Sequence, residues 1–331
     1  MTRLARWETL LAALLVALFA IGIATSDVFL RGSNFSLIAS STMEKAVMAL
    51  PMTLIIIGGE IDLSVASTAG LASAVVGKSW EAGWPLWLCL VTALVVGAAC
   101  GLLNGLLVTR LGLPSLVVTL GTLALYRGLA SVLLADSAIS NFPAGFTRFG
   151  FGKIGGTGIP WTLLVFLPLF VIFDVLLHAT WIGRQLYATG TNPEAARFSA
   201  VRVANLKLGL FVISGVLAAL AGIMYTARVS SSRADNAIGF ELDVIAAVLL
   251  GGVSIFGGRG TLFGVLLSLA AIATLRNILA LNSSNAELQS IAVGSLLILS
   301  VLGPNLVRRL RGAQPGRLAG SRSARMAEAG D

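Results

Sequence analysis

Long stretches without a charged side chain recur along the whole chain, and they constrain its fold more than any other feature. They are 14 to 28 residues long, and ten of them occur in the 331 residues. The windows are 9–26, 46–59, 63–77, 82–109, 111–126, 154–173, 208–227, 244–258, 260–275 and 288–307. About 20 apolar residues cross a bilayer core. Only 11% of residues are charged, against about 25% in soluble domains. The bilayer must therefore be the solvent, and we expect an all-α, polytopic transmembrane bundle of about ten spans.

The distribution of lysine and arginine predicts the orientation of the bundle. With ten crossings, one side receives Arg3, Arg6, Arg110, Arg184, Arg197, Arg202, Lys207, Arg259, Arg308, Arg309 and Arg311. The other side receives Arg31, Lys78, Arg148, Lys153, Arg228 and Arg233. Short cytoplasmic loops carry the excess of basic residues, so both termini are expected in the cytoplasm. Residues 1–311 form the expected membrane domain, and 312–331 lack apolar periodicity and are predicted to be a disordered cytoplasmic tail.

Several classes of protein are excluded by what the chain lacks. The net charge of +8 lies in short loops and at the chain ends, as in membrane proteins, so we expect no nucleic-acid partner. The chain has no G-x-x-x-x-G-K-[ST] phosphate loop and therefore cannot hydrolyse ATP through one. With a single histidine, His178, and two cysteines, a metal site has no support. No clustered catalytic set indicates an enzyme.

Polar residues interrupt the apolar pattern at two related places. Residues 58–64, Gly-Gly-Glu-Ile-Asp-Leu-Ser, separate two short windows, and 239–244 repeats the pattern G-x-E-x-D. Short, glycine-interrupted segments are typical of broken helices that line a pathway. The two copies fall at junctions that face opposite sides, as in an inverted repeat. The alternative is a pair of plain loops with solvated carboxylates.

Six polar residues are candidates for a translocation path. They are Glu60, Asp62, Asn104, Arg127, Glu241 and Asp243. Asn104 lies beside a stripe of small residues, Gly97, Gly101 and Gly105, which favours close helix packing. It is either structural or substrate-facing. Arg127 and Arg228 lie near span ends, where an arginine either pairs or extends its charge to the interface.

The loop 183–201 is the one long polar stretch between two apolar spans. It contains the start signal Asn192-Pro193-Glu194. Asn192 can cap a helix, proline suits the first helical position, and Glu194 favours the positive helix end. We expect a short helix over 192–201 that touches a partner in water. The expected contact residues are Asn192, Pro193, Glu194, Ala195, Ala196, Arg197 and Ser199.

Five motifs together resemble a known family of transporters. They are 59–65 (GEIDLSV), 104–105 (NG), 114–122 (PSLVVTLGT), the loop 183–201 and 241–252 (ELDVIAAVLLGG). On these motifs the chain resembles the permease subunit of bacterial sugar importers of the ATP-binding-cassette (ABC) type that carry ribose, xylose and arabinose. Within that family, 44–66 and 104–115 resemble rhamnose-type permeases most, and autoinducer-2 permeases are similar too. One departure is Ala200, where the family usually has glycine.

The resemblance implies a non-enzymatic membrane subunit that carries no cofactor. A separate cytosolic ATPase would use ATP and push on the loop helix. A periplasmic or lipid-anchored sugar-binding protein would deliver substrate, and a second permease copy or paralogue would complete the path. The location implied is the bacterial inner membrane, among its lipids.

The expected substrate is a neutral monosaccharide, because few charged residues lie in the spans. The resemblance around 44–66 alone puts rhamnose first, with autoinducer 2 or ribose as alternatives. A secondary transporter driven by an ion gradient is the alternative class. It would need ionisable residues deep in several spans.

Overall fold

The computed structural model describes residues 2–298 except 136, 156, 286 and 297, and this part of the chain is almost entirely helical. Within the described residues, β-structure is limited to two isolated bridges, 139 with 232 and 153 with 160. The helices are α1 (Thr2–Thr25), α2 (Gly32–Ile57), α3 (Val65–Glu81), α4 (Leu86–Thr109), α5 (Ser115–Leu134), α6 (Ala144–Phe151), α7 (Trp161–His178), α8 (Trp181–Thr191), α9 (Pro193–Phe198), α10 (Val203–Val229), α11 (Phe240–Leu250) and α12 (Leu262–Leu281). A further helical segment covers 287–296. The all-α prediction is confirmed.

Seven of the ten apolar windows lie in helices long and apolar enough to cross a membrane. These are α1, α2, α4, α5, α7, α10 and α12. The short window 46–59 gains length from the residues before it, because α2 begins at Gly32. The window 63–77 lies in α3, which has 17 residues, and 244–258 overlaps α11, which has 11. The last window, 288–307, extends beyond the described residues, as does the predicted tail, 312–331.

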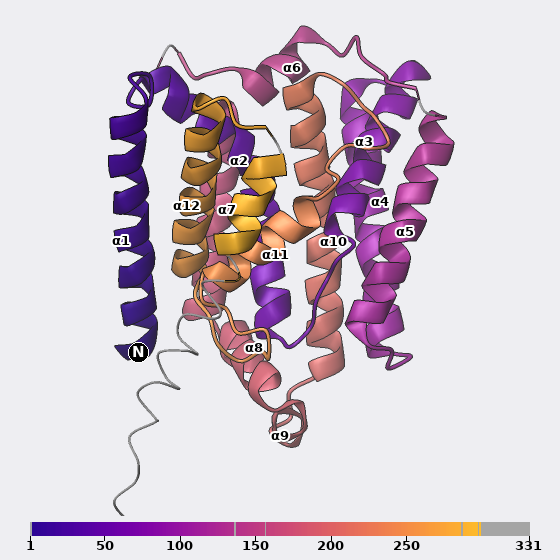
Figure 1. The fold of residues 1–331 in the computed structure, drawn as a ribbon. Helices are drawn as coiled ribbons and strands as arrows, with labels where there is room; N and C mark the ends of the chain where they lie inside the picture. The colour runs from indigo at the N-terminus through magenta and orange to yellow at the C-terminus, as the bar shows by residue number, and fades with distance from the viewer. Residues whose placement is uncertain (1, 136, 156, 286, 297, 299–331) are drawn as a thin grey trace, which may run out of the picture.

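The chain runs up and down between two ends of the bundle (Figure 1). The lower end carries the N-terminus together with α8 and α9, and the upper end carries α6. Two connections enter the bundle from opposite ends. The segment 58–64 rises from the lower end of α2 to α3, and 230–239 descends from the top of α10 to α11 (Figure 1). The first G-x-E-x-D segment lies in the break between α2 and α3, and the second starts α11 directly after the other connection. The two segments lie at opposite entries, in agreement with the broken-helix alternative.

Helix α2 is the central helix of the bundle. Most of its span is buried, whereas α1, α4, α5 and α7 are largely exposed. Val16 of α1 and Val132 of α5 expose 70% and 79% of their surface. Apolar side chains on outer helices face lipid without cost, since hydrocarbon tails are as apolar as they are. The buried interior around α2 is therefore surrounded by lipid-facing helices.

The small-residue stripe on α4 packs against α10. A side-chain carbon added at Gly97 would lie 2.4 Å from the carbonyl oxygen of Gly215, and one added at Gly101 would lie 2.2 Å from that of Phe211. The two backbones approach closely only because these positions have no side chain. This packing places the part of α4 around Asn104 beside the lower half of α10, from Leu208 to Gly215.

Candidate functional site

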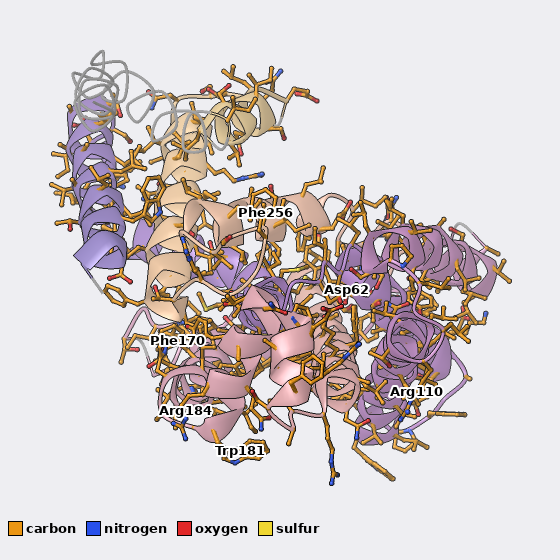
Figure 2. The ribbon with its side chains drawn as sticks, turned by 90° about the horizontal axis from the view of Figure 1, so that it is seen from below. Asp62, Arg110, Phe170, Trp181, Arg184 and Phe256 are labelled. Atoms are coloured by element: carbon orange, nitrogen blue, oxygen red, sulfur yellow. The ribbon has the colours of Figure 1, made fainter. Side chains whose placement is uncertain are left out.

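The break between α2 and α3 is held by a buried carboxylate. Asp62 is 2% exposed. Its oxygens accept hydrogen bonds from the Ser64 hydroxyl at 2.6 Å, the Ser64 amide at 3.0 Å and the Ser214 hydroxyl of α10 at 2.9 Å. A buried carboxylate with several donors is stabilised in place. Figure 2 shows Asp62 well inside the bundle when it is seen from below. Asp62 therefore fixes the course of the broken segment.

Asn104 belongs to the same network. Its amide donates to the Ser64 hydroxyl at 2.8 Å, and its carbonyl accepts from the Tyr126 hydroxyl at 3.2 Å. All of these groups are buried. Of the two roles considered for Asn104, the contacts favour the structural one, because its side-chain oxygen and nitrogen are both engaged by protein.

Glu60 lies at the mouth of this break, where the segment meets α10. It forms an ion pair with Lys207 near the start of α10, and both side chains are about 15% exposed. Glu60 and Asp62 thus both tie the segment to α10. The pair of Glu60 and Lys207 lies near the lower end, and the pair of Asp62 and Ser214 lies deeper in the bundle.

Arg127 holds the second broken connection. Its guanidinium donates to the carbonyl oxygens of Ala234 at 2.6 Å and Asn236 at 2.7 Å. Of the two alternatives for Arg127, these contacts favour pairing. An arginine that donates to loop carbonyls satisfies backbone groups that otherwise lie unpaired near the membrane. It anchors the segment 230–239 that leads into α11.

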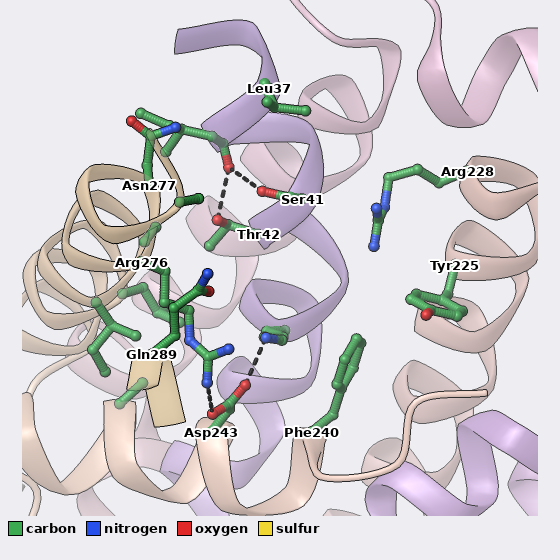
Figure 3. Close-up of a pocket in the computed structure, with 17 residues that line it drawn as sticks. Leu37, Ser41, Thr42, Tyr225, Arg228, Phe240, Asp243, Arg276, Asn277 and Gln289 are labelled. Atoms are coloured by element: carbon green, nitrogen blue, oxygen red, sulfur yellow. Dashed lines mark hydrogen bonds and ion pairs between the residues drawn. The ribbon is translucent and has the colours of Figure 1, made fainter. Parts of the chain in front are cut away.

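A cavity of about 380 Å³, lined by apolar and charged side chains, lies between α2, α10, α11 and α12. Asp243 on α11 pairs with Lys45 of α2 at 2.6 Å and with Arg276 of α12 at 2.5 Å. Figure 3 shows α11 passing beneath the cavity, with Asp243 and Phe240 rising from it. Arg228 of α10 lines the same cavity and donates to Glu44 of α2 at 2.6 Å. Three cations and two carboxylates therefore meet here.

Sequence reasoning found only Asp243 of this cluster as a path candidate and considered Arg228 at an interface. Glu44, Lys45 and Arg276 were missed. Glu44 and Lys45 directly precede the window 46–59, so they resemble loop residues, and only the helical extension of α2 places them within the bundle. Glu241 is half-buried on α11 and forms no ion pair within the described residues.

The polar loop at the lower end folds into two helices. Trp181–Thr191 forms α8, which was not predicted, and Pro193–Phe198 forms α9. The side chain of Asn192 accepts hydrogen bonds from the amides of Glu194 at 3.1 Å and Ala195 at 3.0 Å. The predicted cap, first-turn proline and acidic residue are all confirmed, although α9 ends three residues earlier than expected.

Exposure within α9 changes the expected role of one residue. Ala196 is buried at 3% exposure, so it packs inward, against the loop itself, and does not offer a surface to a partner. The other six contact candidates are exposed. Phe198, which was not considered, is 93% exposed at the end of α9. An aromatic side chain held in water at a capped helix end is typical of a docking position.

Ala200 adopts the backbone conformation that glycine favours. Its φ is +61°, which costs an alanine roughly 1 kcal/mol relative to glycine. The departure from glycine at this position therefore affects the turn after α9, as expected, while the helix before it is retained.

The loop 251–261, between α11 and α12, joins α8 to the central helix α2. The Tyr187 hydroxyl donates to the carbonyl oxygen of Gly260 at 2.7 Å, and the Gly258 amide donates to the carbonyl oxygen of Ile57, the last residue of α2, at 2.8 Å. Burial raises the pKa of Tyr187 to about 12. Phe256 at the tip of this loop is 90% exposed. Figure 2 labels Phe256 together with Trp181 and Arg184 of α8 in the view from below.

An all-helical bundle with broken, polar-lined helices and a capped helix exposed at one end is the architecture of a transporter's membrane subunit. The family described as "Branched-chain amino acid transport system / permease component" matches residues 34–301, and the chain belongs to this family. The chain is 34% identical over 307 residues to the "Autoinducer 2 import system permease protein LsrD" of Klebsiella pneumoniae, covering 91% of this chain and 92% of that protein. The LsrD protein of Yersinia enterocolitica is also 34% identical, over 310 residues, with 91% and 92% covered.

A solved structure supports the fold. The chain matches an inward-facing conformation of a "metal-chelate type ABC transporter" with a TM-score of 0.53 and 19% identity, covering 94% of this chain and 99% of that one.

The permease resemblance drawn from the motifs is confirmed. The chain is a permease subunit of an ABC importer and a multi-pass inner-membrane protein. Permeases of this kind are not enzymes and carry no cofactor, since ATP is used by the partner ATPase. Its partners include that ATPase and a substrate-binding protein. The ion-coupled transporter and the membrane enzyme are therefore excluded.

Proposed function

We propose that this chain forms the membrane path for import of a small, neutral, oxygen-rich molecule, with autoinducer 2 as the first candidate. The observation that carries the proposal is the capped helix α9 at one end of a broken-helix bundle that contains an open cavity with charged side chains in its lining. The relatives named for autoinducer 2 favour it over rhamnose. Ribose and rhamnose follow as alternatives.

The lower end is the proposed contact with the ATPase. Asn192, Pro193, Glu194, Ala195, Arg197 and Ser199 form the exposed surface, and we add Phe198. Ala196 supports this surface from inside. A push on α8 and α9 would reach α2 through two hydrogen bonds, Tyr187 to Gly260 and Gly258 to Ile57.

This assignment places the lower end in the cytoplasm. The N-terminus lies at the same end as α8 and α9 (Figure 1), and we propose that the C-terminus does too. Reporter fusions at Gly312 and Gly155 test the topology. A cytoplasmic signal at Gly312 and an external signal at Gly155 are expected, and an external signal at Gly312 contradicts the orientation.

The cavity is the proposed segment of the translocation path. Charged side chains facing hydrocarbon are costly, so an open cavity that contains Lys45, Asp243 and Arg276 must face water or another protein. A second permease copy or paralogue is proposed to close this side. Asp62 and Asn104 serve the path indirectly, since they hold the break at which α3 begins.

Arg127 and Arg228 lie near the ends of the apolar windows, and Lys45 and Arg276 lie within the helices α2 and α12. Neutrality is now supported by the pairing of these cations with Glu44 and Asp243, and by the names of the relatives.

The deciding experiment is ATP-dependent uptake in proteoliposomes that contain this chain, its ATPase and its binding protein. Autoinducer 2, ribose and rhamnose are each supplied in labelled form. We expect uptake of autoinducer 2, lost in Glu194→Ala. Uptake of only ribose or rhamnose would change the substrate within the importer class, and uptake of none would remove the importer proposal.

A further inference from the structure

The cavity beneath Arg228 contains polar groups that the protein leaves unused. Arg228 donates its Nε hydrogen to Glu44, and its two terminal amino groups form no hydrogen bond within the described residues. The Nε atom of Arg276 is buried without a hydrogen-bond partner, as is the Oε2 atom of Glu44. Each unpaired buried polar atom costs roughly 1–3 kcal/mol. Arg228 and Arg276 line the cavity, and their unused donors indicate a place for a ligand. Glu44 is fully buried and does not line the cavity.

The cavity also offers acceptors. The hydroxyls of Ser41 and Thr42 donate to carbonyl oxygens one turn earlier in α2, so their lone pairs stay free to accept. The Tyr225 hydroxyl lines the cavity and forms no hydrogen bond within the described part of the chain. A ligand that matches this set must accept hydrogen bonds from guanidinium groups and donate them to hydroxyl oxygens. Alcohol groups do both.

Two aromatic rings border the same space. Tyr225 and Phe240 meet edge to face, with centroids 5.3 Å apart, and both face the cavity (Figure 3). Lys45 lies 4.6 Å from the centroid of Phe240, and Arg228 lies 5.1 Å from that of Tyr225. The cations are thereby held in place beside the rings. The apolar ring surface suits the C–H face of a small hydroxylated molecule.

We propose that this cavity is a ligand subsite on the permease itself, which holds one uncharged, hydroxyl-rich molecule through Arg228, Arg276 and Tyr225. The inference rests on the proposed import function and deepens it, because it assigns recognition to the membrane subunit. A volume of about 380 Å³ is within the usual range for small-molecule sites. The three cations of this cluster, Lys45, Arg228 and Arg276, outnumber its two carboxylates, Glu44 and Asp243, by one charge. This excess positive charge favours electron-rich ligand oxygens. A fully ionised anion would lack the hydrogens that the free hydroxyl oxygens require.

The test is binding to the purified full-length permease in lipid nanodiscs, without its partners. Autoinducer 2 and ribose are the neutral probes, measured by saturation-transfer NMR. Inorganic phosphate is the anionic competitor, measured by the loss of the neutral probe's signal. Arg228→Lys keeps the positive charge beside Glu44 but loses the planar guanidinium group and its fixed set of hydrogen-bond donors. Tyr225→Phe keeps the ring and loses the hydroxyl. Arg148→Lys, on exposed α6, is the matched control.

We expect at least one neutral probe to bind the wild type and the control equally. Its dissociation constant should rise about tenfold or more in Arg228→Lys and by a few-fold in Tyr225→Phe. The proposal is overturned if neither neutral probe binds beyond empty nanodiscs, if both variants bind as the wild type does, or if phosphate binds and displaces the neutral probe. Uptake in the reconstituted system distinguishes failure of the subsite from failure of the proposed import function. Wild-type uptake without binding keeps the import function and removes the subsite. Binding without uptake keeps the subsite and removes the import function.

Discussion

The phenolic hydroxyl of Tyr187 on α8 donates a hydrogen bond of 2.7 Å to the carbonyl oxygen of Gly260, which lies 73 residues later in the chain. This contact joins α8, at the end proposed to bind the ATPase, to the loop 251–261. The Gly258 amide of that loop donates a hydrogen bond to Ile57 in the last turn of α2. It is a specific, breakable link between the surface that would receive force and the helix at the centre of the bundle.

Tyr187→Phe removes this bond and leaves the ring. We expect the ATPase complex to assemble normally while uptake falls several-fold, because one neutral hydrogen bond contributes about 1 kcal/mol. The measurement is uptake alongside co-purification of the ATPase. Loss of assembly with the variant would instead place Tyr187 in the docking surface.

Uptake should not depend on the ionisation of Tyr187 over the physiological range. Burial raises its pKa to about 12, above the ordinary value of about 10. The stability contributed by a group with a raised pKa is complete below the unfolded-state value and is lost only as pH rises through the folded-state value. The ratio of wild-type to Tyr187→Phe uptake should therefore be flat between about pH 6 and pH 9. A ratio that changes across this range contradicts the assignment.

Removing the cap of α9 should weaken coupling without affecting the membrane bundle. Asn192→Ala leaves the amides of Glu194 and Ala195 without their acceptor, and loss of such a cap costs about 1 kcal/mol. We expect faster amide hydrogen exchange in 194–198 and lower uptake. Asn192→Asp preserves the acceptor and is the matched control. Equal exchange in both variants would show that the cap does not order this helix.

Asp243→Asn should destabilise the permease more than a comparable change at the surface. The substitution leaves Lys45 and Arg276 without their shared carboxylate in a mostly buried place, and we expect a loss of about 2–3 kcal/mol. Asp235→Asn is the control, because its pair with Arg233 is more than half exposed and contributes below about 1 kcal/mol. Thermal unfolding in detergent makes the comparison. Similar melting temperatures for both variants would mean that the cavity pairs are as well hydrated as the surface pair.

Gly101→Ala should disrupt the contact between α4 and α10. The added methyl would lie 2.2 Å from the carbonyl oxygen of Phe211, and overpacking of this kind costs roughly 1–3 kcal/mol. Gly121→Ala on α5 meets no atom within 4 Å and should be neutral or slightly stabilising. Folded yield and melting temperature of the two variants provide the measurement. A stable Gly101→Ala protein would show that α4 shifts freely.

Local patterns of the sequence predict most of the helices of this protein. Charge-free windows predict helices because an unpaired backbone in hydrocarbon is too costly. The start of α9 follows from Asn192, Pro193 and Glu194, since a cap acts over only three residues. The stripe of Gly97, Gly101 and Gly105 similarly predicts a close helix contact from spacing alone. The length of α11 and the helix α8 escaped prediction, because polar and short segments carry little periodicity.

The sequence by itself determined that this chain is a helical membrane bundle with a capped helix at one end. It offered 58–64 and 239–244 as candidate breaks, and the second of these begins α11 after a break at 230–239. Only the tertiary structure decided which charges meet. Lys45 and Asp243 are 198 residues apart, and Glu44 and Arg228 are 184 apart. Pairing across such distances depends on how α2, α10 and α11 pack, and that packing follows from side-chain fit over the whole interior. Likewise, Ala196 is as small as its exposed neighbour Ala195, and only the fold turns it inward.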